Sequence, residues 1–121
     1  MTPKDWRRVL TTNLDAVFYW AQEAAKRMLA ANRQGAIVNI ASVLGLMVAK
    51  GGAAYATAKA GVVQVTKALA VELAFKGIRV NAIAPGWIET EMNEGYLNSE
   101  AGAKIKRDIP MGSFGNAGGL D

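Results

Sequence analysis

The sequence predicts an α/β fold in which long helices alternate with strands of a parallel sheet. Residues 36–41 form a short run of aliphatic and β-branched residues without polar alternation, Asn39 excepted, as is typical of a parallel strand covered on both faces. Long segments with apolar residues at three- and four-residue spacing lie before and after it, and residues 78–84 predict a second strand. Helix-linked strands of this kind make a right-handed crossover. A chain of 121 residues is one domain's worth, and we predict no second domain.

The first helix is predicted to begin at Thr2. Thr2 is the N-cap, Pro3 takes the first helical position and Asp5 lies near the positive end of the helix dipole. Gly35 marks the predicted end. Asn13 falls in the apolar stripe, and spacing alone favours a polar residue at the stripe's edge that is bonded to backbone. The stripe consists of Trp6, Val9, Leu10, Val17, Ala21, Ala24, Met28 and Leu29.

The second helix is predicted from about residue 53 to residue 76, where Gly77 ends it. Its larger stripe contains Tyr55, Lys59, Val62, Thr66, Leu69 and Leu73. A second stripe contains only small residues, namely Ala54, Ala58, Gly61, Val65 and Ala68. Small side chains let another backbone come close, which is compatible with two partners. One is the sheet of the same chain, and the other is a helix of a second subunit.

The last third of the chain has less regular patterning. Pro85 and Gly86 break the second strand, and Asn81 within that strand is interpreted as a satisfied core amide. Residues 87–112 suit either a mobile lid over a ligand or a plain surface loop with one short helix. Residues 112–121, with four glycines, predict no firm element.

Composition excludes several classes of function. The chain has no Cys and no His, so we expect no disulfides, no thiolate or imidazole chemistry and no metal site. The net charge of +4 is scattered, whereas nucleic-acid binding calls for a clustered basic stripe. No apolar run suits a signal peptide or a membrane span, so the expected location is cytoplasmic, without a membrane partner. The chemistry left is that of Tyr, Lys, Ser, Asn and carboxylates.

Three polar residues are placed to converge on one site. Tyr55 and Lys59 are four residues apart in a helical segment, so their side chains leave the same face one turn apart. Ser42 follows the first strand at its carboxyl end, where open parallel sheets present groups to ligands. Each signal alone is weak, because such pairs are usually surface residues and such serines are usually caps. The combination predicts a site.

Four segments together resemble the short-chain dehydrogenase/reductase family, over residues 2 to about 116. They are VLTTNLDAVF with Asn13, IVNIAS with Ser42, YATAK with Tyr55 and Lys59, and NAIAPGWIET with Pro85, Gly86 and Thr90. Their order and spacing agree with the family. The resemblance implies a partial Rossmann-like, doubly wound parallel sheet. It also implies NAD or NADP as cofactor and hydride transfer between nicotinamide and a small alcohol or carbonyl substrate.

The resemblance assigns roles to four catalytic candidates. Tyr55 would be the general acid in reduction or the base in oxidation, and Lys59 would favour the phenolate and bond the nicotinamide ribose. A free phenol, with a pKa of about 10, is too weakly acidic for this task without such a charge. Ser42 would hold the substrate oxygen and stabilise charge there. Asn13 would support a water that links Lys59 to solvent.

The resemblance also implies a cofactor-binding set. Pro85 and Gly86 would help to cradle the nicotinamide, while Ile88 would offer its backbone and Thr90 its hydroxyl to the carboxamide. Tyr55 and Lys59 belong to this set as well. The family's glycine-rich turn for the pyrophosphate has no counterpart in this sequence. We therefore expect the catalytic C-terminal half of a longer enzyme.

Two expectations follow from the missing strands. The sheet would have unpaired edges, so the isolated chain is predicted to be marginally stable or to associate. Association is expected to give a homo-oligomer through the two long helices. The alternative function is then a catalytically incompetent fragment that acts only as a helix-mediated oligomerisation module.

Overall fold

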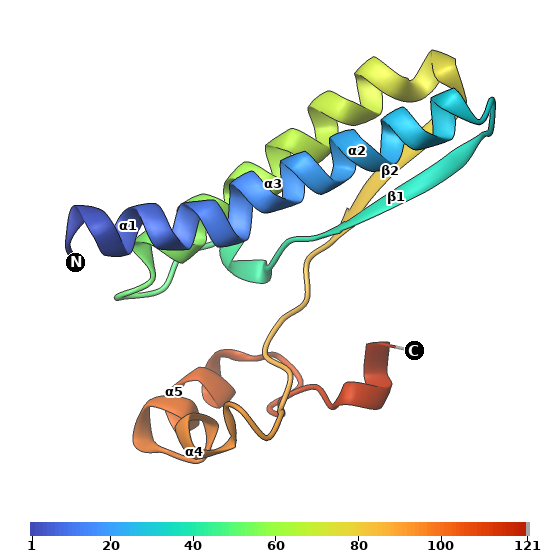
Figure 1. The fold of residues 1–121 in the computed structure, drawn as a ribbon. Helices are drawn as coiled ribbons and strands as arrows, with labels where there is room; N and C mark the ends of the chain where they lie inside the picture. The colour runs from blue at the N-terminus through green and yellow to red at the C-terminus, as the bar shows by residue number, and fades with distance from the viewer. Residues whose placement is uncertain (121) are drawn as a thin grey trace. The chain divides into compact units, whose positions relative to one another are not determined.

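A computed structural model describes residues 1–120, in two compact units, one formed by Met1–Ala84 and the other beginning at Pro85. The first unit has two parallel strands, β1 (Gly35–Ile40) and β2 (Ile78–Ile83), in one sheet (Figure 1). Gly35 lies opposite Ile78, and Ile40 lies opposite Ile83. Strand positions and direction therefore confirm the α/β prediction.

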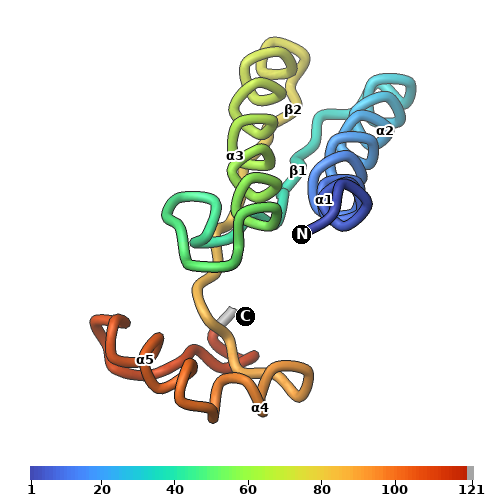
Figure 2. Tube along the Cα trace, turned by 90° about the vertical axis from the view of Figure 1, so that its left-hand side faces the viewer, coloured from blue at the N-terminus to red at the C-terminus, as the bar shows by residue number. Residues whose placement is uncertain are grey.

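Helices cover one face of this sheet. The chain begins with α1 (Pro3–Leu10), a π-helical turn η1 (Thr11–Asp15) and α2 (Ala16–Ala30), while α3 (Ala53–Leu73) connects the two strands. In two views, α2 and α3 run side by side over the strands (Figures 1 and 2). The core between these layers consists of Ala21, Ala25, Ile37, Leu69, Leu73, Ile78 and Val80.

The opposite face of the sheet is exposed. Val38, Ile40 and Ile83 point away from the helices, and Val38 is 58% exposed. The sequence predicted that the first strand is covered on both faces. Within the described residues this prediction is wrong, since helices pack on one face only. The burial of Ile37 and Asn39 alternates with the exposure of Val38 and Ile40, as a strand's twofold periodicity requires.

The start of the first helix is as predicted. The Asp5 backbone N–H donates to Thr2 Oγ1 at 3.1 Å, and the Thr2 N–H donates to Asp5 Oδ2 at 3.1 Å. This reciprocal capping box satisfies two backbone donors that the helix cannot. The hydrogen bonds from Thr2 also lower the pKa of the Asp5 carboxyl.

The end of that helix differs from the prediction. It stops at Ala30, and Asn32 rather than Gly35 takes the left-handed conformation, with φ of 50°. Asparagine tolerates this conformation and commonly terminates helices. Gly35 instead begins β1, where a Cβ would lie 2.5 Å from the Met28 sulfur. A larger residue at this position would require the Met28 side chain to move.

The end of α3 is confirmed. A 3-10 turn η3 (Ala74–Lys76) continues the helix, and Gly77 follows with φ of 77°. Its N–H donates to the Ala74 carbonyl at 3.0 Å. Gly77 thus allows the chain to leave the helix and enter β2 directly.

The second unit contains two short helices, α4 (Glu94–Leu97) and α5 (Glu100–Asp108), and a 3-10 turn η4 (Ala117–Leu120). The surface-loop alternative predicted only one helix here. Ile88 and Gly115 form an isolated parallel bridge within this unit. None of the helices in the described part of the chain has the length and apolar character that crossing a bilayer requires.

Candidate active site

Ser42 lies at the carboxyl end of β1, as predicted. The Ala41 N–H still donates to the Ile83 carbonyl at 2.8 Å, after which the chain turns into η2 (Val43–Gly45). Ser42 Oγ accepts the Leu44 N–H at 3.1 Å and so caps this turn. The capping bond uses an oxygen lone pair, and a hydroxyl that accepts in this way can still donate its proton.

Tyr55 and Lys59 lie together near the start of α3. The Lys59 Nζ is 5.6 Å from the centre of the Tyr55 ring, so the four-residue spacing does bring phenol and ammonium together. The same Nζ donates to the Ile40 carbonyl at 2.9 Å. Burial lowers the pKa of Lys59. The ammonium thus joins α3 to the end of β1, close in sequence to Ser42.

Gly45 brings the loop after Ser42 onto α3. A Cβ on Gly45 would lie 2.7 Å from the Lys59 carbonyl carbon and oxygen and 3.0 Å from the Ala60 nitrogen. Only glycine permits this approach of two backbones. No pattern in the sequence analysis singled out Gly45. The available signal was its position three residues after Ser42, where the polypeptide must leave the strand and meet the helix.

Asn13 lies in η1, the π-helical turn between α1 and α2. Its Nδ2 donates to the Val9 carbonyl at 3.0 Å, which is the backbone bond that spacing alone favoured. A π turn opens the helical ladder locally and is frequent at functional sites. The apolar spacing did not reveal this turn. The consecutive β-branched residues Thr11 and Thr12 before a mid-helix asparagine were the signal for a disturbed helix.

The same turn packs on α3 beside Lys59. A Cβ on Gly61 would lie 2.9 Å from the Leu14 side-chain methyls, so the small residue admits a side chain of η1. Asn13 and Lys59 line one groove of about 610 Å³ together with Trp20 and residues of β1. The structure therefore brings Asn13, Tyr55, Lys59 and the loop of Ser42 to one end of the sheet.

The first part of the small-residue stripe of α3 packs within this chain, whereas Ala68 at its other end is exposed. Ala54 and Ala58 are buried, and Gly61 meets Leu14. The sequence left two partners open for this stripe, the sheet of the same chain and a helix of a second subunit. Within the chain, α3 contacts the sheet and also the first helical segment.

The second unit contains the other cofactor candidates, which are Pro85, Gly86, Ile88 and Thr90. Gly115 holds this segment from one side: the Glu89 N–H donates to the Gly115 carbonyl at 2.8 Å, and the Gly115 N–H donates to the Trp87 carbonyl at 2.9 Å.

Asn93 holds the same segment from another direction. Its Oδ1 accepts the Thr90 N–H at 2.8 Å, and its Nδ2 donates to the Ile88 carbonyl at 2.9 Å. The Thr90 side chain remains exposed. Sequence reasoning missed both supports, because neither Asn93 nor Gly115 belongs to a periodic pattern.

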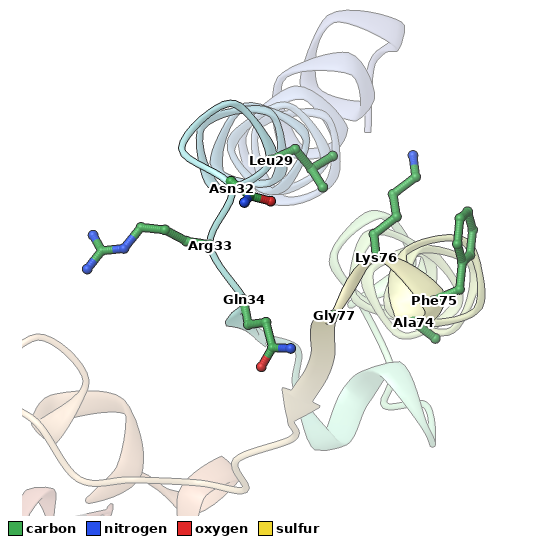
Figure 3. A pocket seen from close by; sticks show the side chains of 8 residues that line it. All are labelled: Leu29, Asn32, Arg33, Gln34, Ala74, Phe75, Lys76 and Gly77. Atoms are coloured by element: carbon green, nitrogen blue, oxygen red, sulfur yellow. The ribbon is translucent and has the colours of Figure 1, made fainter.

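A recess at the opposite end of the sheet lacks the properties of a site. It lies between the turn after α2 and the turn after α3, and Figure 3 shows the residues that line it. Its two cationic side chains, Arg33 and Lys76, extend in different directions rather than toward a common point (Figure 3). Convergent polar groups are what distinguish a binding site from a surface hollow.

Comparison with known proteins identifies the family. The family model described as Enoyl-(Acyl carrier protein) reductase matches residues 1–119. The chain belongs to this family. The resemblance to the short-chain dehydrogenase/reductases, drawn from sequence motifs, is thereby confirmed, and so is the Rossmann-like α/β fold class.

Curated relatives of this short-chain dehydrogenase/reductase chain include two bacterial proteins named 3-oxoacyl-(acyl-carrier-protein) reductase FabG. The protein from Chlamydia pneumoniae is 41% identical over 115 residues, which are 95% of this chain and 46% of that protein. The protein from Aquifex aeolicus is 44% identical over 116 residues, or 96% of this chain and 46% of that protein. The chain thus spans about half the length of these relatives.

Solved structures show the same relation. A 4-hydroxyisoleucine dehydrogenase mutant complexed with NADH and succinate has a TM-score of 0.89 and 36% identity, covering 98% of this chain and 49% of that one. An NAD⁺-bound xylitol dehydrogenase has a TM-score of 0.85 and 30% identity, covering 95% and 50%. The described arrangement of helices and strands is that of about half of each enzyme.

Proposed function

We propose that this chain provides the catalytic part of an NAD- or NADP-dependent oxidoreductase that interconverts an alcohol and a carbonyl compound. The observation that carries the proposal is the Lys59 ammonium beside the Tyr55 ring, at the end of the strand that leads to Ser42. The names of the relatives, all reductases or dehydrogenases, support it.

The proposed chemistry follows from three side chains. Tyr55 donates a proton to the substrate oxygen in reduction and removes it in oxidation. Lys59 lies beside the Tyr55 ring, and its positive charge would stabilise negative charge that develops there during proton transfer. Ser42 donates its hydroxyl proton to the same substrate oxygen, where charge develops during the reaction. Asn13, with its Nδ2 bound to Val9, retains its amide oxygen to accept from a water on the way to Lys59.

The residues present fit the nicotinamide end of the dinucleotide. Lys59 lies on the groove shared with Asn13, where it would bond a ribose hydroxyl of the cofactor. In the second unit, Thr90 presents an exposed side chain on a segment that Asn93 and Gly115 hold in place. We propose that this segment, with Pro85, Gly86 and the Ile88 backbone, binds the carboxamide. The nicotinamide supplies the hydride when bound; the protein positions it.

The helix-mediated oligomerisation module stays the second candidate. Aromatic and aliphatic side chains are exposed on both long helices: Trp20 is 76% exposed on α2, and Val71 is 78% exposed on α3. Large apolar side chains exposed on a helical layer can be covered by association with another chain. This observation supports a homo-oligomer, which is compatible with either function.

A cofactor titration tests the proposed function. NADH and NADPH are titrated into the 121-residue chain, and quenching of tryptophan fluorescence is followed. We expect saturable binding that Lys59→Ala weakens about tenfold or more, since a hydrogen bond to a charged group contributes about 1.5–3 kcal/mol. Tyr55→Phe should weaken binding less than Lys59→Ala does, because it keeps the aromatic ring and removes only a neutral hydroxyl.

Two variants control for nonspecific effects. Lys76→Ala removes the same charge at the far end of α3, and Tyr19→Phe removes a phenol from the exposed surface of α2; both should bind as the parent chain does. Absence of binding at millimolar cofactor, with a folded circular-dichroism spectrum, would contradict the proposal. Equal weakening by Lys59→Ala and Lys76→Ala would also do so, because it would indicate nonspecific charge attraction.

A further inference from the structure

Asn39 and Thr66 form a buried polar pair to which the proposed chemistry assigns no role. Among the described residues, the buried polar side chains are Asn39 at 6% exposure, Thr66 at 7% and Ser42 at 8%. Asn39 Nδ2 donates to Thr66 Oγ1 at 3.0 Å, and Thr66 Oγ1 donates to the Val62 carbonyl at 2.7 Å. The hydroxyl thus links the amide on β1 to the backbone of α3.

This pair and Lys59 tie α3 to adjacent residues of β1. Lys59 bonds the Ile40 carbonyl, while Thr66 bonds the side chain of Asn39. Lys59 and Thr66 are seven residues apart, which is about two turns and about 10 Å along the same helix face. Two directional bonds at different heights restrict both rotation of α3 about its axis and sliding along the strand.

The remaining contacts between α3 and the sheet are less directional. Val62, Leu69 and Leu73 are buried on this helix face. Apolar burial depends mainly on area, whereas hydrogen bonds depend on distance and angle. A shifted register could preserve much of the apolar burial, but it would leave the Asn39 amide buried without its partner, which is unfavourable. The pair therefore discriminates between registers that apolar packing tolerates.

We infer that Asn39 and Thr66 are positioning residues, which set the register of α3 on β1 and so hold Tyr55 and Lys59 in place relative to Ser42. The inference rests on the proposed function for the roles of those three side chains. Small displacements of such groups reduce catalysis strongly, because proton transfer requires hydrogen-bond distance.

The test separates position from stability in the full 121-residue chain. Thr66→Val removes the acceptor with little change of shape, and Asn39→Leu/Thr66→Val replaces both partners with apolar groups. The first variant should be destabilised. The double variant should recover much of that loss, because it leaves no buried amide unpaired. Urea denaturation measures both.

The positional readout is the titration of Lys59 Nζ, followed by NMR in chain labelled with ¹⁵N-lysine and assigned with Lys59→Met. Burial lowers the pKa of Lys59 in the parent chain. We expect this pKa to rise toward that of an exposed lysine in Thr66→Val and to stay raised in the double variant. Thr66→Ser keeps the hydroxyl and should restore the parent titration. Thr66→Ala provides a second variant without the hydroxyl.

The outcomes are distinguishable. If the pKa of Lys59 returns to the parent value in the double variant, it follows the stability of the chain. The pair would then be merely structural, and the inference would be overturned. An unchanged titration in Thr66→Val and Thr66→Ala would overturn it too. The NMR readout uses no cofactor. If the parent chain binds no NADH, the proposed function fails while the titration still decides the positioning role. If it binds, the variants without the hydroxyl should bind about tenfold more weakly.

Discussion

Gly45 shows how a single residue sets the distance between the candidate catalytic groups. The loop that carries Ser42 touches the backbone of α3 at Lys59 and Ala60, and a glycine is required at the contact. Because Lys59 in turn bonds the Ile40 carbonyl, loop, helix and strand meet within one turn of α3. The geometry of the site thus depends on a residue without a functional group.

We predict that Gly45→Ala destabilises the chain by about 1–3 kcal/mol, the usual range for overpacking. The methyl would meet backbone atoms of α3, which cannot rotate away. It should also weaken NADH binding by displacing Lys59. Urea denaturation and the cofactor titration measure these effects.

Gly52→Ala is the matched control in the same loop. Its Cβ would lie at an ordinary 3.6 Å from the Ala49 carbonyl oxygen, and its φ is −102°. This variant should change the free energy of unfolding by less than about 1 kcal/mol, because alanine restricts the unfolded chain but is a poorer N-cap residue than the glycine that precedes α3. Equal stability of the two variants would contradict the packing explanation of Gly45.

At the scale of the elements, two helix ends use the left-handed conformation in different ways. α2 ends with Asn32 at φ of 50°, and α3 with its 3-10 extension ends with Gly77 at φ of 77°. Both turns lead into strands of the same sheet. Their backbone angles therefore determine where β1 and β2 begin.

Substitutions at these two helix ends should shift the free energy of unfolding in opposite directions. Gly77→Ala is expected to cost about 1–2 kcal/mol, since a Cβ is unfavourable in this conformation and would lie 3.0 Å from Gln34 Cγ. Asn32→Gly should stabilise slightly, by a few tenths of a kcal/mol, by relieving the same conformational cost. Thermal denaturation of both variants measures the difference. A destabilised Asn32→Gly would show that the asparagine side chain has another role.

The elements also show the limits of sequence patterns. Capping residues predicted the start at Thr2 and the end at Gly77, since caps act through neighbouring residues in sequence. The apolar spacing predicted a single first helix, whereas η1 interrupts it. Beyond this turn, Ala21 of the predicted stripe is buried, but Leu29 is exposed, and Ala25, outside the stripe, is buried. The spacing of apolar residues indicates which face of a helix is buried, but it does not reveal a single widened turn.

For the whole molecule, the important feature is apolar surface that the chain leaves exposed. Val38 and Ile40 lie on the open face of the sheet, while Trp20 on α2, Val71 on α3 and Phe75 in η3 form exposed positions along the helical layer. Exposed apolar surface favours association, and unpaired strand edges add donors and acceptors for another chain.

We predict concentration-dependent self-association of the 121-residue chain, measured by sedimentation velocity. Val71→Lys on the helical layer should raise the dissociation constant about tenfold or more, because burying a valine contributes about 1.5–3 kcal/mol. Val38→Lys tests in the same way whether the open face of the sheet takes part in self-association. A single monomeric species at all concentrations, with a cooperative and reversible melt, would contradict this prediction.

The site was predictable in part. The spacing of Tyr55 and Lys59 placed both on one helical face, and the strand end placed Ser42, because these are consequences of local geometry. The bond from Lys59 to Ile40 and the pairing of Asn39 with Thr66 join residues 19 and 27 positions apart. No local pattern encodes such contacts.

By itself, the sequence determined the two strands and their parallel order, the long helices before and between them, the family and the set of candidate residues, since periodicity, caps and motifs act over short separations. Only the tertiary structure decided which face of the sheet the helices cover, where the first helix widens and which polar groups meet. Those features depend on how α3 packs on β1, where distant residues such as Asn39 and Thr66 must satisfy each other's hydrogen bonds away from water.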